Sequence, residues 1–209
     1  EVKIDAEINS VSRFTFSQRL KVEFSDILFN MTLSKMVNFT FSNLGGLGNI
    51  SVLLASGQRR YNASGAGKAS VIVEAGGYNL TANSGERIFL TRTNINETSS
   101  SVSGDLIQRV VVSGSARAGG PGKVGIPIIV RELKSGWTPD RIETSSGGAY
   151  EVHLMPGKGY SFTINHTVNE SRGDTNVPVE YSFSGVLEAP FTDLFTYDLY
   201  MRSRVVNVT

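Results

Sequence analysis

Apolar and polar residues alternate one by one along most of this chain, and this pattern restricts its fold more than any other feature. Val37, Phe39 and Phe41, for example, flank the polar residues Asn38 and Thr40. Successive side chains of a β-strand point to opposite faces of a sheet, so such a segment has one core face and one solvent face. No convincing amphipathic helix is present. The pattern predicts an all-β protein.

Short apolar runs separated by Gly, Asn, Ser and Pro clusters define the expected strands. We expect strands over residues 27–33, 37–41, 49–54, 71–74, 78–82, 86–92, 105–113, 124–131, 149–155, 160–168, 177–187 and 194–208. Ala75-Gly76-Gly77 is the best candidate for a tight hairpin turn, and no repeat of constant period emerges. Many short strands with glycine turns predict an antiparallel, immunoglobulin-like or pilin-like β-sandwich.

The length of 209 residues, with 40% hydrophobic content, allows a sizeable core. All-β sandwiches of this length commonly form a single domain. We therefore expect an N-terminal tail at residues 1–12, followed by one head domain at residues 13–209.

Asn-x-Ser/Thr triplets, the acceptors of N-linked glycans, are unusually frequent. The chain has 14 Asn, and chance placement would give roughly three triplets. There are nine, at Asn30, Asn38, Asn49, Asn62, Asn79, Asn96, Asn165, Asn169 and Asn207. A triplet becomes a glycan site only if the chain crosses a membrane to meet the transferase, so the excess predicts a surface glycoprotein. The alternative is a Ser/Thr/Asn-rich secreted β protein with some unused triplets.

In the clearest strands, the acceptor Asn falls on the parity opposite the large apolar residues. Asn79, for example, lies between Tyr78 and Leu80. These Asn side chains should therefore occupy the solvent face of a sheet whose other face is core. Glycans there would shield strands and edges from proteases and from unwanted pairing.

Charge and hydropathy argue against two classes of partner. The 20 basic and 19 acidic residues are well mixed and give a net charge of +1, with no basic stripe for nucleic acid or lipid. No apolar run approaches the 18 residues or so that span a bilayer. The chain begins at Glu1 without Met, as expected of a mature product whose leader has been removed.

The absence of cysteine narrows the expected compartment. Small secreted proteins of the eukaryotic pathway usually carry disulfides, and this chain has no Cys. Many glycan acceptors without Cys favour a prokaryotic exterior, where archaea N-glycosylate heavily. The alternative is a large-cored domain that needs no disulfide.

The N-terminal segment is a strand with an unusual need for burial. Val2, Ile4, Ala6 and Ile8 alternate with polar residues. Burying Val2, Ile4 and Ile8 would contribute roughly 5–9 kcal/mol before ordering costs. We predict that these four residues form a donor strand that fills a groove in a neighbouring copy. The alternative is a terminal strand paired inside its own sheet.

With these features the chain resembles the thread pilins of thermoacidophilic archaea. The resemblance rests on a cysteine-free, all-β chain, dense in glycan acceptors, that opens on Val2-x-Ile4-x-Ala6-x-Ile8. It implies an extracellular filament subunit, similar to bacterial chaperone-usher pilins, whose N-terminal strand completes the sandwich of the next subunit. The chain departs from those bacterial pilins in lacking their cysteines. It also lacks the long apolar N-terminal helix of type IV pilins.

Residues that could carry chemistry are few. With only His153 and His166 and no Cys, a metal cage would need both histidines plus carboxylates, and exposed strand histidines are the simpler interpretation. Carboxylate pairs, Asp193 with Asp198 or Glu180 with Glu188, could suggest a glycosidase, but sequence cannot place them at the required separation. We predict no catalytic, metal or cofactor-binding residues, and no enzyme activity.

Three motifs have simpler explanations than their functional ones. Ser64–Lys68 resembles a phosphate loop, but Asn62 replaces the first glycine, so a turn is expected. Arg172-Gly173-Asp174 is ordinary turn chemistry, although integrins read the same tripeptide. Trp137, beside a turn, is a core or interface anchor, and a sugar-stacking role is the alternative.

The sequence therefore predicts a structural, N-glycosylated subunit of a cell-surface filament, a homopolymer joined head to tail and serving adhesion or biofilm formation. The main rival is a monomeric adhesin, carbohydrate-binding or surface-lattice domain. A secreted β-sandwich hydrolase is a third hypothesis.

Overall fold

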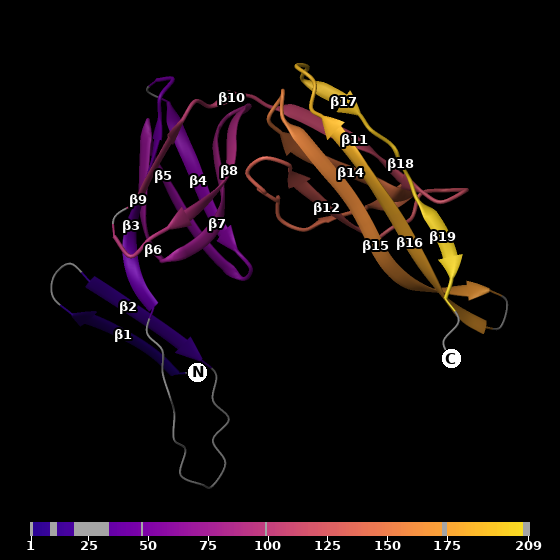
Figure 1. Ribbon diagram of the computed structural model, residues 1–209, viewed down its shortest axis with the longest axis horizontal. Helices are drawn as coiled ribbons and strands as arrows, with labels where there is room; N and C mark the ends of the chain where they lie inside the picture. Colours follow the sequence, from indigo (N-terminus) through magenta and orange to yellow (C-terminus); the bar gives the residue numbers. More distant parts are fainter. Residues whose placement is uncertain are drawn as a thin grey trace, which may run out of the picture. The chain divides into compact units, whose positions relative to one another are not determined.

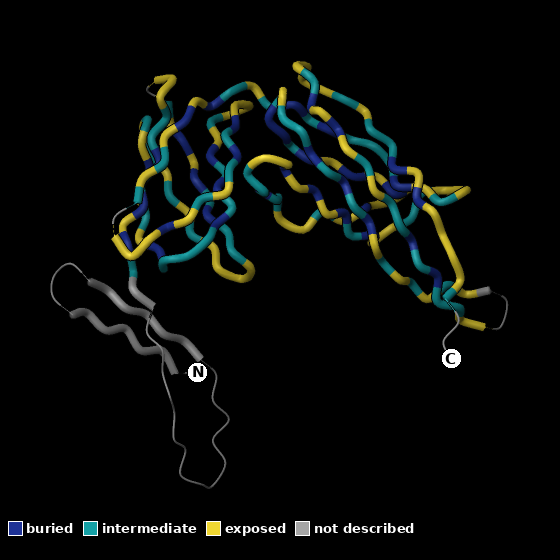
Figure 2. Tube along the Cα trace, in the orientation of Figure 1, coloured by how far each residue is buried: buried dark blue, intermediate teal, exposed yellow. Residues whose placement is uncertain are grey.

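The computed structural model describes the backbone of residues 2–8, 12–18, 34–46, 48–98, 100–172 and 175–206, and the side chains of residues 36–46, 48–98, 100–171 and 175–206 (Figures 1 and 2). The described residues form nineteen β-strands and one short 3-10 turn, Ser146–Gly148. The all-β prediction is confirmed. Asn30, Asn207 and most of the strand expected at 27–33 lie outside the described residues.

The chain divides into two compact units. The first unit comprises residues 1–84 and 92–105, and the second comprises residues 85–91 and 106–209. The expectation of one head domain over residues 13–209 stays a prediction. One boundary falls inside the strand β8 (Arg87–Ile95), between residues 91 and 92, and another between residues 105 and 106. No Gly/Pro-rich linker marks either of them in the sequence.

The strands up to residue 108 form two sheets. The strands are β1 (Val2–Ile8), β2 (Ser12–Gln18), β3 (Ser34–Asn43), β4 (Asn49–Ser56), β5 (Arg59–Ala66), β6 (Lys68–Glu74), β7 (Gly76–Ser84), β8 (Arg87–Ile95) and β9 (Ser100–Gly104). One sheet has the order β1-β2-β3-β6, with β9 pairing parallel to β3. The other has the order β10-β8-β7-β4-β5, where β10 is Ile107–Gln108.

The later strands also form two sheets. These strands are β11 (Val110–Arg117), β12 (Pro127–Glu132), β13 (Ile142–Glu143), β14 (Ala149–Leu154), β15 (Gly159–Arg172), β16 (Thr175–Glu188), β17 (Leu194–Thr196), β18 (Leu199–Tyr200) and β19 (Arg202–Val205). One sheet has the order β14-β11-β17, with β18 also on β11, and both short strands run parallel to β11. The other has the order β13-β12-β15-β16-β19.

By strand order, the chain contains the same arrangement twice. The first set of strands is β3–β10, with the orders β6-β3-β9 in one sheet and β5-β4-β7-β8-β10 in the other. The second set is β11–β19, with the orders β14-β11-β17/β18 and β13-β12-β15-β16-β19. The first strand of each set pairs in parallel with a late strand: β3 with β9, and β11 with β17. The last strand of each set is short and pairs antiparallel with the sixth strand: β10 with β8, and β19 with β16. Strand lengths differ between the sets, so the sequence shows no constant period.

Alternation of burial within each strand creates the cores. In β4 the odd-numbered Asn49 and Ser51 are exposed, whereas Ile50 and Val52 are buried. In the second unit, buried residues of β11, β12, β14, β15 and β16 join in one cluster (Figure 2). Phe162 lies at its centre, fully buried, with its ring 5.3 Å from that of Tyr197 and 6.2 Å from that of Tyr150.

Two local predictions were wrong. The Ala75-Gly76-Gly77 break does not close a hairpin, because β6 and β7 belong to different sheets and the chain crosses between them there. Gly76 has φ of 153°, a conformation that L side chains rarely adopt. The strand expected at 194–208 is divided into three short strands, because residues between them switch the chain from β11 to β16.

Candidate glycan-bearing surface and strand edges

Seven of the nine glycan acceptors lie within the described side chains. Six of them are exposed, and the seventh, Asn79, is half-buried. The exposed acceptors are Asn38, Asn49, Asn62, Asn96, Asn165 and Asn169. The strand periodicity explains the result: Asn38 is exposed while its neighbours Val37 and Phe39 are 5% and 0% exposed. The structure thus exposes six of the seven described acceptor side chains to solvent.

Two acceptors share one face of the long strand β15. Asn165 and Asn169 are both exposed, whereas His166, Val168 and Glu170 between and beside them are half-buried. Four residues of extended chain span about 13 Å, so both positions have room for a glycan on the same face. The opposite face of this strand is the one that turns inward.

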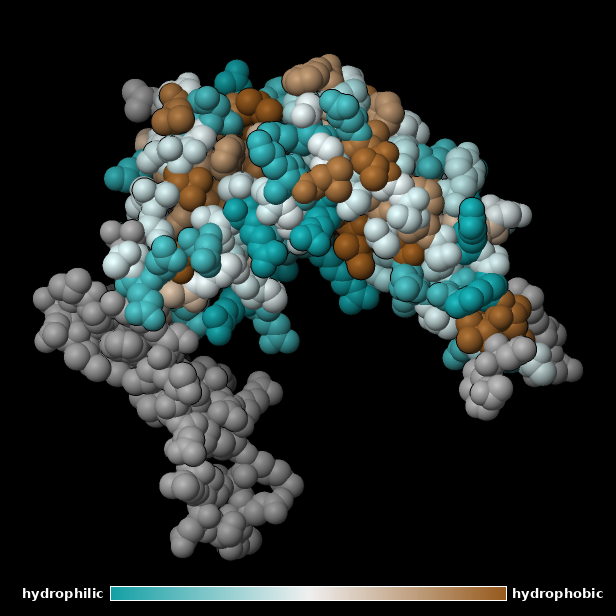
Figure 3. Space-filling view, viewed as in Figure 1, coloured by the Kyte–Doolittle hydropathy of each residue, from teal (hydrophilic) through white to brown (hydrophobic). Residues whose placement is uncertain are grey.

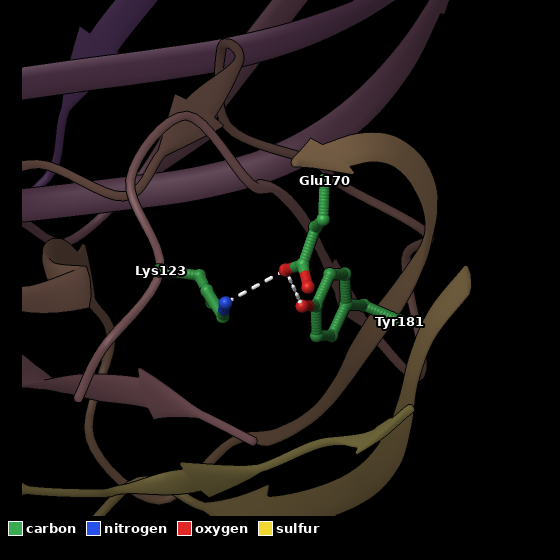
Figure 4. Close-up of polar contacts among 3 residues, drawn as sticks. All are labelled: Lys123, Glu170 and Tyr181. Carbon is green, nitrogen blue, oxygen red and sulfur yellow. Dashed lines mark hydrogen bonds and ion pairs between the residues drawn. The ribbon is translucent and has the colours of Figure 1, made fainter. Parts of the chain in front are cut away.

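Glu170, the middle residue of the Asn169 triplet, anchors that inner face (Figure 4). Its Oε1 lies 2.7 Å from Nζ of Lys123 and also accepts a hydrogen bond from the hydroxyl of Tyr181. The Lys123 ammonium lies 5.5 Å from the centre of the Tyr181 ring. The hydrogen bonds to Glu170 and Tyr181 raise the pKa of Lys123. The cluster ties the β11–β12 loop to the β15–β16 hairpin, and sequence reasoning missed it.

A buried carboxylate organises the turn after β12. Glu132 is 5% exposed, and its two carboxylate oxygens accept the backbone N–H groups of Lys134 and Ser135. Burial acts to raise the pKa of Glu132, but the hydrogen bonds from Ser135 and Lys134 and the charge of Lys158 outweigh it and hold the pKa below its usual value. The turn places Trp137 in the core of the second unit, where it is 3% exposed.

Replacing Glu132 with Gln is expected to destabilise the second unit by about 1–3 kcal/mol at neutral pH, because backbone donors lose a charged acceptor. A carboxyl with a depressed folded-state pKa contributes stability above its unfolded pKa and loses it as pH falls through the folded pKa. Wild-type stability should therefore decline below about pH 4.5, and part of that decline should be absent in the variant. Denaturant unfolding between pH 7 and pH 3 measures both; identical pH profiles would contradict the assigned role.

The predicted donor strand pairs within its own chain in this structure. Residues 2–8 form β1, antiparallel to β2, with Ile4 opposite Phe16 and Ala6 opposite Phe14. This is the alternative that the sequence left open. The strand order begins on β1, so its second edge has no partner strand among the described residues. The role of Val2, Ile4, Ala6 and Ile8 between copies stays a prediction.

The histidines lie apart from any grouping that could hold a metal. His153 on β14 is half-buried with Nε2 3.1 Å from Oε1 of Glu151, and His166 is half-buried on β15. Among the described residues, no group of three or more His, Cys, Asp or Glu side chains could bind a metal ion. Within the same residues, no helix is long and apolar enough to cross a membrane.

The remaining sequence motifs have structural roles where they are described. Gly67, with φ of 65°, turns the chain between β5 and β6, as predicted for Ser64–Lys68. Trp137 is a core residue, as predicted, and its indole nitrogen has no hydrogen-bond partner. Gly173 and Asp174 lie outside the described residues.

The second unit carries a polar hollow of about 650 Å³ over the outer face of β11 and its neighbours. Hydroxyl, carboxylate and guanidinium groups line it: Ser113, Ser115, Arg117, Glu151, Thr196 and Asp198. Oδ1 of Asp198 accepts the backbone N–H of Ser115 at 2.8 Å, so the bulge between β17 and β18 is fixed at its rim. Such a lining suits a polar, hydroxylated ligand rather than an apolar one.

Comparisons with known proteins give no family. No protein-family model matches the chain, and no curated protein matches it. Solved structures similar to it include the TIE protein of Bacillus anthracis, with 9% identity, a TM-score of 0.31, and 80% of this chain matched to 34% of that one. A leucine-rich repeat protein from Bacteroides thetaiotaomicron has 11% identity, a TM-score of 0.38, and 80% of this chain matched to 26% of that one.

A third similar structure is GBS52, the minor pilin of Streptococcus agalactiae. Its identity is 11% and its TM-score is 0.33, with 83% of this chain matched to 98% of that one. The chain thus spans about a third of the Bacillus protein and about a quarter of the Bacteroides protein. TM-scores of this size assign neither a fold nor a function, so the functional argument rests on the residues of this chain.

Proposed function

We propose that this chain is the structural subunit of an extracellular, N-glycosylated cell-surface filament of the kind that the archaeal thread pilins form. Copies of the chain join head to tail through residues 2–8, which add a strand to the neighbouring copy. The filament serves adhesion or biofilm formation, and the protein needs no cofactor beyond its covalent glycans.

One observation carries the proposal: both ends of the described chain are strands at sheet edges. One sheet begins on β1 and another ends on β19. An exposed strand edge is a template for pairing with another chain. Because the two edges differ, pairing between them is heterologous, and a heterologous contact that does not close on itself propagates into a polymer.

The exposed acceptors support the surface location. Glycans at Asn38, Asn49, Asn62, Asn96, Asn165 and Asn169 would stand on solvent-facing positions of both units, because each of these side chains is exposed. Each of these side chains can therefore receive a glycan without any rearrangement of the fold. A dense coat of this kind would protect a filament that is exposed permanently to proteases.

Native material tests this function directly. We expect electron micrographs of the producing cell to show filaments, and intact-mass analysis of the purified subunit to show a mass above that of the bare 22.6 kDa chain. Replacing the six exposed acceptors with Gln should lower the mass by six glycan units. An unmodified mass, or native protein that is monomeric at every concentration, would contradict the proposal.

The polar hollow of the second unit favours one second candidate, a monomeric adhesin that binds carbohydrate. Its hydroxyls and carboxylates, among them Ser113, Thr196 and Asp198, are groups that hydrogen-bond to sugars. The same experiment separates the two functions, since an adhesin would stay monomeric in the micrographs and on size exclusion.

A further inference from the structure

The C-terminal strand β19 forms an edge with two chemically different faces. On one side it pairs antiparallel with β16, from Val205 opposite Val179 to Arg202 opposite Ser182. The order of the sheet ends on β19, so within the described chain its other side has no partner strand. All four of its residues are exposed (Figure 2).

Cross-strand neighbours identify the two faces of β19, because opposite residues point to the same side of a sheet. Ser203 and Val205 lie opposite Tyr181 and Val179, which are 2% and 1% exposed, so they share the core side. Val205 is nevertheless 45% exposed. In the space-filling view, hydrophobic side chains gather at the surface where β19 ends beside the β15–β16 hairpin (Figure 3). The core side of this edge is therefore incompletely covered.

The opposite face of β19 is basic. Arg202 and Arg204 lie two residues apart and point to the same side, with Nε of Arg204 2.5 Å from Oε2 of Glu180 on β16. Arginine pairs at this spacing on an edge strand match a partner strand that carries acidic residues at the same spacing.

The N-terminal strand β1 has the complementary pattern. In the sequence Val2-Lys3-Ile4-Asp5-Ala6-Glu7-Ile8, the acidic residues Asp5 and Glu7 are two apart, and apolar residues occupy every even position. β1 forms the first edge of its own sheet through its pairing with β2. Its second edge is thus available without any change in that pairing.

We propose that β1 of one copy pairs antiparallel with β19 of the next copy, edge to edge, with Ala6 opposite Ser203. This proposal rests on the filament function proposed above and specifies its joint. The register sets Asp5 opposite Arg204 and Glu7 opposite Arg202 on one face. On the other face it sets Ile4 opposite Val205 and Ile8 opposite Met201. Charged residues then meet opposite charges, and apolar residues cover the exposed side of Val205.

Three other edges of the sheets fit β1 less well. β14 carries Glu151, and the β17–β18 edge carries Asp198 between its halves, so both would repel Asp5 and Glu7. β5 is basic at Arg59 and Arg60, but it carries the glycan acceptor Asn62 in its middle. The four residues of β19 are basic at two positions and include no acceptor, and Asn207 lies two residues beyond its end.

The internal repeat supports the same location. β10 occupies in the first set the position that β19 occupies in the second, antiparallel to the sixth strand of its set. After β10, a single residue leads into β11, the first strand of the next set. Within the chain, the next set therefore begins directly after the counterpart of β19. A joint at β19 would likewise place the first strands of the next copy, β1 and β2, after the last strand of the second set.

Charge reversal tests the joint in the full chain. The variants R202E/R204E and D5K/E7K should each raise the critical concentration for polymerisation at least tenfold, because like charges face each other in both. Mixed in equal amounts, they should form alternating polymers at the wild-type concentration, since each acidic strand then meets a basic one. Sedimentation and negative-stain microscopy measure both. If either variant polymerises like wild type, or if the mixture fails to recover, the proposed joint is wrong.

Cysteine cross-linking tests the register, and the chain is suited to it because it contains no cysteine. The variant A6C/S203C should give a ladder of oligomers on non-reducing gels, since opposite residues of antiparallel strands lie within disulfide range. The control variant K3C/S203C leaves both arginines in place, puts its thiols on opposite faces and three residues out of register, and should give no ladder. Equal ladders, or none in A6C/S203C, would overturn the register. If wild type itself never polymerises, the filament function fails, whereas wild-type filaments without this cross-link reject only the joint.

Discussion

Replacing both Ile4 and Ile8 with Asp is expected to leave the protein as monomers. Two carboxylates would stand where apolar side chains must enter the interface between copies. Burying each unpaired charge costs several kcal/mol, which exceeds what the remaining contacts of a seven-residue strand contribute. Light scattering after size exclusion would give the mass of a single glycosylated subunit, and micrographs would show no filaments.

A matched variant separates this effect from a general effect of added charge. K3D/E7D places two aspartates on the polar parity of the same strand and should assemble into filaments. Circular dichroism should show the same β content for both variants and for wild type. Filaments of normal length from the Ile4→Asp, Ile8→Asp protein would show that residues 2–8 do not join the copies.

Replacing Phe162 with Ala is expected to destabilise the second unit by about 3–5 kcal/mol, because it removes a large side chain from a fully buried site and leaves a cavity. Phe162 is 0% exposed and contacts the rings of Tyr150 and Tyr197. Tyr197 lies in the bulge between β17 and β18 that leads to β19, so the loss should also loosen the C-terminal edge. Denaturant unfolding of the purified subunit measures the stability.

The same unit provides the control. Phe191 is 85% exposed, and Phe191→Ala should change the free energy of unfolding by no more than about 0.5 kcal/mol. The contrast isolates burial from the chemistry of the substitution. Equal effects of the two substitutions would show that the described core does not support the second unit.

The faces of the strands could be predicted from the sequence because alternation is a local property. Val37 and Phe39 were expected in the core and Asn38 on the surface, and burial confirms each of them. The prediction failed where strands lack large apolar residues. β5 consists of the run Arg-Arg-Tyr-Asn followed by four small residues, and β9 is mostly serine, so neither gave a signal.

The residues of the proposed joint between copies also divide into those that the sequence predicted and those that it missed. The alternation of Ile4, Ala6 and Ile8 could be read directly, as could the acceptor triplets. Arg202 and Arg204, in contrast, were part of one expected strand over residues 194–208, and nothing local distinguished them as an edge. Glu132 and the Lys123–Glu170–Tyr181 cluster were also missed, because their partners come from separate loops and strands.

By itself the sequence determined that the chain is all-β, which side chains of its clearest strands turn inward, and that six of its acceptor asparagines face solvent. Each of these follows from the two-residue period of a single strand. Only the tertiary structure decided which strands pair, that β6 and β7 part into different sheets, that one arrangement occurs twice, and that β1 and β19 are edges. Backbone hydrogen bonds between strands are chemically alike whatever the partner, so pairing depends on how distant segments pack together, and a local pattern does not contain that information.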